Sequence, residues 1–525
     1  MIKTKKTRIE FPAHLIEIRT LMPELLEILE SGRTDDWYSF IWLEETKSLS
    51  CVAAANEKSG ESLDRGMVLR VLVDGENFEK STNLLERQNL ISRAQEFRAE
   101  LDKKFPKVKS KSYRPATWKE EDLTTLGSDI IEQLPKNMDS TTEVHFSPLC
   151  EGNPFETEIA TLKKLATETR NEILEKSKKY VEANSNFQEL ADVRSMVRQE
   201  ITTNVFVDRS KNMSQTLPIS LLYSMGMTKT GQVGRSMAGG LGGLEVAVHS
   251  EEDIVEAALR PLQLANAKKL APGRYQIISG PDVTGVIAHE AFGHTQEGDT
   301  WMKGRSIAKN LHESKIKVGN DQACIVNHPN MFSMEDLSHG SNGSYFFDHE
   351  GQLARAQIIL DKGILAVPMT DLTSALRLNV PRTANGKRES WRRPIMARQT
   401  NTYFTPGDKT VEELIGMVSD GFLARWASGG MEDPKGGSLT AGASYLEEIK
   451  NGKLTGEIYL GPSGGHVELS DPVFTLLERI VAKSKSVNKH NIPENKFGGC
   501  GKYHKESVQA GCGGPFILWE SINCG

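Results

Sequence analysis

The sequence predicts a mixed α+β protein, with an α/β N-terminal region followed by a β-rich C-terminal region that carries a His-Glu-x-x-x-His helix. Apolar residues recur at helical spacing in several segments before about residue 200. From about residue 320 onward, short apolar runs alternate with turn dipeptides, which is typical of hairpins. Between these regions, Gly280-Pro281-Asp282 indicates a helix start that leads directly to His289.

Residues 1–105 are predicted to form a small α/β domain. Asp74-Gly75 follows an apolar run and is typical of a tight turn. The other expected elements are a helix at 23–29, strands at 38–43 and 67–73, and a helix within 82–104.

Residues 106–215 are predicted to form a middle region of helices and linkers. Prolines interrupt residues 105–155, which indicates linkers and short strands. After them, the spacing of apolar residues predicts an amphipathic helix over 159–180. A second helix is expected at 187–198 and a strand at 201–207.

Residues 216–525 are predicted to form a β-rich domain. Its glycine-dense run at 231–243 lacks the Gly-Lys-Ser/Thr ending of a phosphate loop, so a flexible loop near a cleft is favoured over nucleotide binding. The other expected elements are a capped helix from Ser250 to about 269, a strand at 275–278, hairpin turns at 361–363 and 450–453, and helices at 411–422 and 472–485.

Composition excludes several classes of protein. A net charge of −6 gives no electrostatic reason to expect nucleic acid or an anionic membrane as a partner. We find no signal peptide and no apolar run near the roughly 20 residues that cross a bilayer. Six cysteines in 525 residues do not make a disulfide scaffold, and a cytoplasmic location is expected.

The segment 289–294, His-Glu-Ala-Phe-Gly-His, carries the most chemical information. Its histidines are five residues apart, and five residues of an α-helix turn through about 500°, which leaves the two rings roughly 140° apart. A regular helix therefore cannot direct both rings at one ion. Either the helix widens into a single π-turn, or it ends near Gly293 and His294 returns from the loop.

Two imidazoles beside a carboxylate suit metal-assisted hydrolysis. A catalytic zinc site has three protein ligands and an open position for water, and a neighbouring carboxylate takes the proton from that water. His289 and His294 are the candidate ligands and Glu290 is the candidate general base. A histidine considered alone is more often a satisfied or solvated side chain, so the motif is suggestive and not decisive.

Five segments resemble motifs of one family, the TldD/PmbA metallopeptidases, and specifically their catalytic TldD-like branch. The resemblance begins with the eleven residues at 289–299 and covers about residues 230–515. The other four segments are Phe347-Asp348-His349-Glu350-Gly351, Ala384-Asn385-Gly386-Lys387-Arg388-Glu389-Ser390, Gln399-Thr400-Asn401-Thr402-Tyr403 and Gly499-Cys500-Gly501-Lys502.

The resemblance implies that 216–525 is a catalytic domain and that Cys500 is the third ligand of one Zn²⁺ ion. It also implies an unfolded or extended peptide as substrate, and a homodimer or a heterodimer with a non-catalytic relative. Glu297 and Asp299 are expected to support the ligand histidines, with a solvated acidic turn as the alternative. Arg388, Glu389 and Asn401 either line the cleft and bind a peptide backbone, or make structural ion pairs.

Several alternatives stay open. After Cys500 the residues differ from the family pattern, so His504 or Cys512 is an additional candidate ligand, and 431–437 indicates local variation in the cleft wall. A non-peptide amide substrate, or a regulatory subunit whose metal is structural, would use the same residues. The sequence does not identify the oxyanion-stabilising residue, or distinguish endo- from exopeptidase action.

Overall fold

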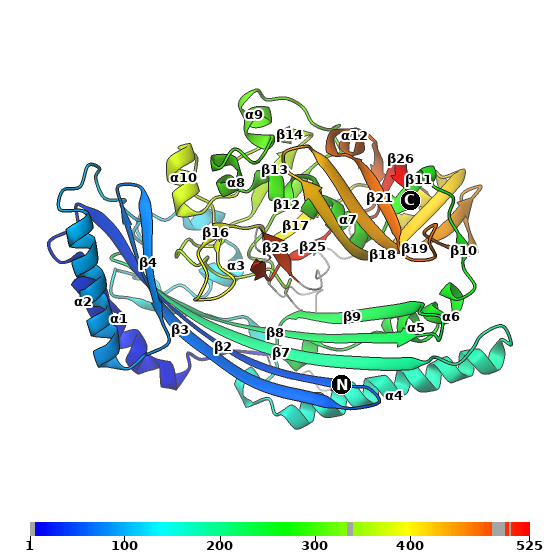
Figure 1. The fold of residues 1–525 in the computed structure, drawn as a ribbon, viewed down its shortest axis with the longest axis horizontal. Coiled ribbons are helices and arrows are strands. Elements are labelled where there is room, and N and C mark those ends of the chain that lie inside the picture. Colours follow the sequence, from blue (N-terminus) through cyan, green and yellow to red (C-terminus); the bar gives the residue numbers. More distant parts are fainter. Residues whose placement is uncertain (1–5, 333–339, 486–498, 503–505) are drawn as a thin grey trace.

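The computed structural model describes residues 6–332, 340–485, 499–502 and 506–525. Figure 1 shows a long curved sheet with helices on its outer side, and a second, β-rich part above its other side. This arrangement confirms the predicted mixed α+β class with a β-rich C-terminal region. Among the described helices, none is both long enough and apolar enough to cross a membrane.

The strands of the N-terminal sheet pair in the order β4-β3-β2-β7-β8-β5. Strand β5 pairs with residues 212–215 of β8, and β9 pairs with residues 219–227 of the same strand. Its hairpin turn at Asp74-Gly75 is confirmed, since both residues have positive φ. The strands are β2 (Trp37–Ala53), β3 (Lys58–Val73), β4 (Glu76–Thr82), β5 (Glu143–Phe146), β7 (Asp192–Val207), β8 (Asn212–Met227) and β9 (Val233–Leu241), and β1 (Thr7–Arg8) pairs separately with β6 (Leu149–Cys150).

Three long helices cover one face of this sheet and confirm the helices expected around 23–29, 82–104 and 159–180. They are α1 (Ile16–Glu30), α2 (Arg87–Lys104) and α4 (Ile159–Ala183). Leucines of α1 and α2 pack on β2 and β3, whereas α4 packs on β2 and β7. Shorter turns precede or join them: η1 (Ala13–Leu15), η2 (Leu123–Thr125), α3 (Ser128–Ile131) and η3 (Pro154–Glu156).

Two predictions in this region are wrong. The helix expected at 187–198 is the beginning of β7, where Val193, Ser195 and Val197 are buried on alternate positions. The loop expected at 231–243 is mostly the strand β9. Glycine is required there, because a Cβ on Gly239 would lie 2.1 Å from the carbonyl oxygen of Ser220 on β8.

The C-terminal part contains a large sheet of order β10-β20-β19-β18-β11-β26-β21, with β22 beside β26. Because β19 also pairs with β21, five of these strands close into a ring. The strands are β10 (Lys268–Lys269), β11 (Gly273–Ser279), β18 (Asp420–Asp433), β19 (Ser438–Lys450), β20 (Lys453–Leu460), β21 (Val467–Pro472), β22 (Ile480–Lys483) and β26 (Ile517–Cys524).

A second C-terminal sheet has the order β14-β13-β12-β17-β25. Helix α7 (Pro281–Ala288) packs against β17, β18, β19 and β25, so strands of both sheets contact the helix that precedes His289. The remaining strands are β12 (Ile325–Asn327), β13 (Gln357–Asp361), β14 (Ile364–Leu365), β15 (Gly386–Lys387), β16 (Met396–Ala397), β17 (Asn401–Phe404), β23 (Cys500–Lys502), β24 (Glu506–Val508) and β25 (Gly511–Gly513).

The C-terminal turns confirm the sequence pattern better than the helices do. Lys362-Gly363 and Asn451-Gly452 both have positive φ in hairpin turns, and Ser250 makes the expected capping box. The helices expected over 250–269, 411–422 and 472–485 end early. They are α5 (Glu251–Ala258) with α6 (Arg260–Leu264), α11 (Val411–Gly416) and α12 (Val473–Glu478). Further helices of this part are η4 (Leu244–Val246), α8 (Gly298–Met302), α9 (Ala308–Glu313) and α10 (Leu372–Leu378).

The N-terminal sheet takes strands from all three predicted domain ranges. It contains β2 from 1–105, β7 from 106–215 and β9 from 216–525. The division into domains at these boundaries stays a prediction.

Candidate metal centre

A short irregular helix presents the two histidines. Helix α7 continues into η5, a π-helical turn at His289–Gly293, and then into the 3₁₀ turn η6 (His294–Gln296). A π-turn has more residues per turn than an α-helix, so it brings residues five apart towards the same face. Of the two alternatives that the spacing allowed, the structure therefore has the widened helix.

Gly293 permits this turn by its size and not by its backbone angles. Its φ of −65° is open to any residue, but a Cβ there would lie 2.3 Å from Oε1 of Gln399. Gln399 in turn donates from Nε2 to the backbone carbonyl of His289 at 3.3 Å. The Gln399 amide thus satisfies a carbonyl at the start of the π-turn and packs directly on Gly293.

Cys500 comes from β23, far along the sequence, and joins the two histidines. Its Sγ lies 3.1 Å from Nε2 of His289 and 3.3 Å from Nε2 of His294. The ligand atoms of all three side chains lie within 4.8 Å of one another. His289 and Cys500 are buried, whereas the side chain of His294 is 17% exposed. The cluster is therefore reached from the His294 side.

The charges around Cys500 favour its thiolate. Burial alone would raise the pKa of this thiol, but His294, His289 and Arg398 together hold the pKa well below its usual range. Burial by itself lowers the pKa of His294, yet Cys500 and Glu297 raise it well above the ordinary value. The thiolate is the form of cysteine that binds a metal ion, so the cluster has the charge that a ligand set requires.

Glu297 contacts His294. Its Oε2 accepts a hydrogen bond from Nδ1 of His294 at 3.2 Å, which leaves Nε2 directed at Cys500. Although burial raises the pKa of Glu297, Lys502 and then His294 lower it to about 2. Asp299 lies one step further out, where its Oδ1 binds Nζ of Lys502 at 2.5 Å.

Glu290 is nearly buried beneath β18. A Cβ on Gly430 would lie 2.5 Å from Cγ1 of Val286 and 2.9 Å from Cγ of Glu290. The glycine therefore lets the strand pass directly over the stem of Glu290. Since Val286 lies one helical turn before Glu290, both side chains face the same strand.

The three other candidate residues from the sequence make structural contacts. Arg388 forms an ion pair at 2.9 Å with Glu79 of β4 and so joins the two parts of the molecule. Asn401 accepts hydrogen bonds from Ser341 and from the amide of Gly343. Glu389 pairs with Arg393 at 3.6 Å. These partners belong to the scaffold around the centre.

Of the two other candidate ligands, His504 and Cys512, the structure describes only Cys512. His504 lies outside the described residues. Cys512, on β25, is buried in the hydrophobic core that surrounds α7, and it is not part of the group of three that could hold an ion.

Zinc fits these residues. The fourth position of a catalytic site belongs to water, so three protein ligands suffice. Zinc bonds of about 2.0–2.1 Å to nitrogen and about 2.3 Å to sulfur need ligand atoms roughly 3–4 Å apart, close to the distances between Cys500 and the two histidines. Two imidazoles with one thiolate also favour zinc over calcium or magnesium.

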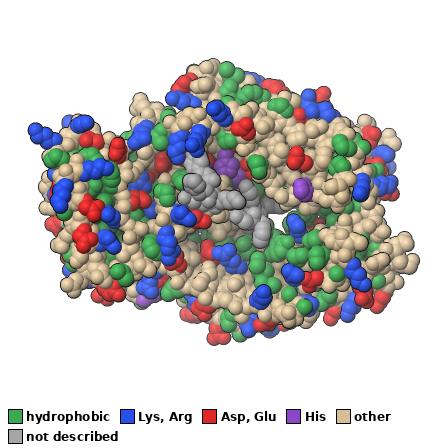
Figure 2. Space-filling view, in the orientation of Figure 1, with side chains coloured by type: hydrophobic (Ala, Val, Ile, Leu, Met, Phe, Trp, Pro, Cys, Tyr) green, Lys and Arg blue, Asp and Glu red, His purple; other side chains and the backbone are tan. Residues whose placement is uncertain are grey.

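A cleft of about 1150 Å³ includes Val286, one helical turn before Glu290, among its lining residues. Met237 and Ala238 of β9 line one wall, while Val286 of α7 and Gly429 of β18 line the other. Figure 2 shows the hollow between the two parts of the molecule, with hydrophobic side chains along its lower edge. The glycine-dense run does lie beside a cleft, as predicted, although as a strand.

Sequence reasoning missed four residues around the centre. Lys502 binds Glu297 and Asp299, and Arg398 binds the backbone carbonyl of Cys500 and lies 3.8 Å from Glu297. Gln399 and Glu432 are the others. Lys502 and Gln399 lie within two of the segments that resemble family motifs. The sequence therefore pointed to these residues but did not indicate a role for either of them.

The comparisons identify a matching family and several relatives. Residues 272–525 match the PmbA/TldA metallopeptidase C-terminal domain. A metalloprotease of Methanocaldococcus jannaschii is 30% identical over 54% of this chain and 58% of its own length. A zinc metalloprotease TldD homolog of Saccharolobus solfataricus is 26% identical over 48% of this chain and 52% of its own. This chain thus spans little more than half the length of these relatives.

A solved structure shares the fold across nearly the whole chain. TldE of Thermococcus kodakarensis superimposes with a TM-score of 0.63 at 14% identity, over 97% of this chain and 99% of that one. At this identity the likeness shows the fold alone, and it extends well beyond the residues that the family model matches.

Proposed function

Residues 272–525 belong to the PmbA/TldA metallopeptidase family, and on this premise we propose that the chain is a zinc-dependent peptidase that hydrolyses unfolded or extended peptides. One observation carries the proposal: Sγ of Cys500 lies within 3.3 Å of both histidine Nε2 atoms, and Glu290 directly follows the first histidine. The name of the Saccharolobus relative supports zinc as the metal.

Each side chain has a role in this proposal. His289, His294 and Cys500 hold the ion, which when bound lowers the pKa of water towards about 7 and polarises a carbonyl. Glu290 accepts the proton of the attacking water and returns it to the leaving amine. Glu297 fixes the ring of His294, while Lys502 and Arg398 hold Glu297 ionised.

The shape of the cleft supports an extended substrate. Its two walls are the strands β9 and β18 with α7, so a flexible chain fits between them more readily than a folded domain. We further propose that the protein works as a dimer, either with a second copy or with a non-catalytic relative. Light scattering of the purified chain, alone and mixed with such a relative, measures this directly.

The substrate class is tested with three matched substrates: an unstructured peptide, a stably folded small protein, and a small non-peptide amide. We expect hydrolysis of the peptide only, loss of that activity after removal of metal by a chelator, and recovery on addition of zinc. Equal turnover of the small amide would favour the non-peptide hydrolase. Inactivity of the zinc-loaded protein together with unfolding on chelation would favour a structural metal.

A further inference from the structure

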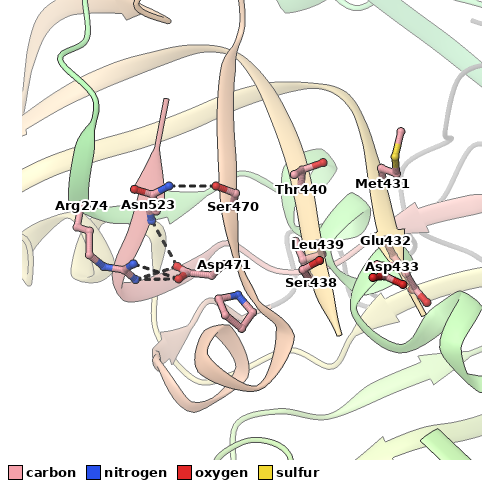
Figure 3. Close-up of a pocket in the computed structure, with 11 residues that line it drawn as sticks. Arg274, Met431, Glu432, Asp433, Ser438, Leu439, Thr440, Ser470, Asp471 and Asn523 are labelled. Carbon is pink, nitrogen blue, oxygen red and sulfur yellow. Dashed lines mark hydrogen bonds and ion pairs between the residues drawn. The ribbon is translucent and has the colours of Figure 1, made fainter. Parts of the chain in front are cut away.

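Glu432 lies on β18 and faces the metal centre. In the paired strands, Met431 is opposite Thr440, Glu432 is opposite Leu439, and Asp433 is opposite Ser438. Because side chains alternate along a strand, Glu432 points to the other face from its two neighbours. Figure 3 labels Glu432 with Met431 and Asp433 among the residues that line a pocket on this part of β18, and the hydrogen bond from Thr295 places the Glu432 carboxyl group beside the turn that carries His294.

The side chain of Glu432 reaches the turn that carries His294. Its Oε1 accepts a hydrogen bond from the hydroxyl of Thr295. Its Oε2 is buried and, within the described residues, has no hydrogen-bond partner. A buried carboxyl oxygen without a partner is costly, so this atom is suited to a donor that comes from outside the chain.

Two other carboxyl groups, those of Glu290 and Glu297, act on Glu432. Burial raises the pKa of Glu432, and Glu290 and Glu297 raise it further, whereas His294 opposes them. Lys502 and Arg398 pair with Glu297. A positively charged ligand group would relieve the repulsion between these carboxyl groups.

The cleft between β9 and β18 has an acidic lining. Five carboxylates and three arginines line it, and two of those arginines, Arg260 and Arg425, already pair with glutamates. The potential along the cleft therefore favours a cationic ligand over an anionic one.

We propose that Glu432 selects peptides that carry a cationic group next to the cleaved bond, either a lysine or arginine side chain or the free α-amino group. This inference rests on the proposed peptidase function. Oε2 of Glu432 receives the ammonium or guanidinium N–H, while Oε1 keeps the hydroxyl of Thr295.

The test uses one neutral unstructured peptide in which a single lysine, or its neutral isostere norleucine, is placed in turn at each position near the cleaved bond. Each peptide is made with a free and with an acetylated N-terminus, which separates the side chain from the α-amino group. We expect kcat/KM of the zinc-loaded wild type to favour one cationic form at least about tenfold. In Glu432→Gln, this ratio should fall to near one.

Asp433→Asn is the matched control, because it removes the same charge from the next residue on the outer face, and the tenfold ratio should persist. A second readout does not depend on turnover: the ratio of Kd values for the cationic and neutral peptides, measured in Glu290→Gln with and without Glu432→Gln. Loss of this binding ratio in the double variant supports the inference even if no peptide is cleaved. A ratio near one in the wild type, or an unchanged ratio in Glu432→Gln, overturns it.

Discussion

Glu290→Gln is expected to reduce hydrolysis of an unstructured peptide by at least about 10³-fold while the protein stays folded and retains its metal. The glutamine amide has the shape of the carboxylate but cannot accept a proton. The proposed ligands are His289, His294 and Cys500, so none of them is altered by this change. The measurement is kcat on the zinc-loaded protein, together with its zinc content and thermal unfolding.

Glu313→Gln, at the exposed end of α9, is the matched control and should leave kcat within about twofold, as for other surface changes. If Glu290→Gln turned over peptide at the wild-type rate, Glu290 would not be the base. If it lost zinc, its side chain would have a part in holding the ion that the geometry does not indicate.

Lys502→Met is expected to lower the free energy of unfolding by about 3 kcal/mol, the largest effect on stability that we predict. Lys502 is 6% exposed and lies 2.8 Å from Oε2 of Glu297 and 2.5 Å from Oδ1 of Asp299. Its removal leaves two carboxylates close together in a buried site. Denaturant unfolding of the two proteins measures the difference.

The pH dependence of that difference has a definite sign. The pKa of Glu297 is about 2 in the fold, below its ordinary value, mainly because Lys502 and His294 oppose the effect of burial. This carboxylate therefore contributes stability above about pH 4.5 and loses it as pH falls towards 2. The difference between wild type and Lys502→Met should shrink over that interval.

Lys303→Met is the comparison that isolates burial. Lys303 pairs with the same Asp299 at 3.6 Å but is 41% exposed, so its removal should cost less than about 1 kcal/mol. A similar cost for both lysines would contradict the account of Glu297 as a buried carboxylate neutralised by Lys502.

The sequence contained the local geometry of the centre but not its assembly. The five-residue spacing of His289 and His294 demanded an irregular helix, because the angular step per residue is fixed. It could not decide between a π-turn and a helix end, since Gln399, which packs on Gly293, lies over 100 residues away. The role of Cys500 as the third ligand was inferred from the family resemblance alone.

The missed strands have a different cause. β9 is rich in glycine, and its glycines are there to allow close approach to β8, but glycine in sequence is equally typical of a loop. In β7 the alternation of Val193, Ser195 and Val197 was visible, yet serine on the buried face weakened the pattern. Lys502 and Glu432 gain their importance from tertiary partners that no local pattern predicts.

Metal content is the most direct test of the proposed centre. Wild type, His294→Ala, Cys500→Ser and the buried control Cys512→Ser are purified identically and their zinc is measured per chain. We predict one zinc ion in the wild type and in Cys512→Ser, and a large loss in His294→Ala and Cys500→Ser. Full zinc retention in folded Cys500→Ser would contradict the site formed by His289, His294 and Cys500.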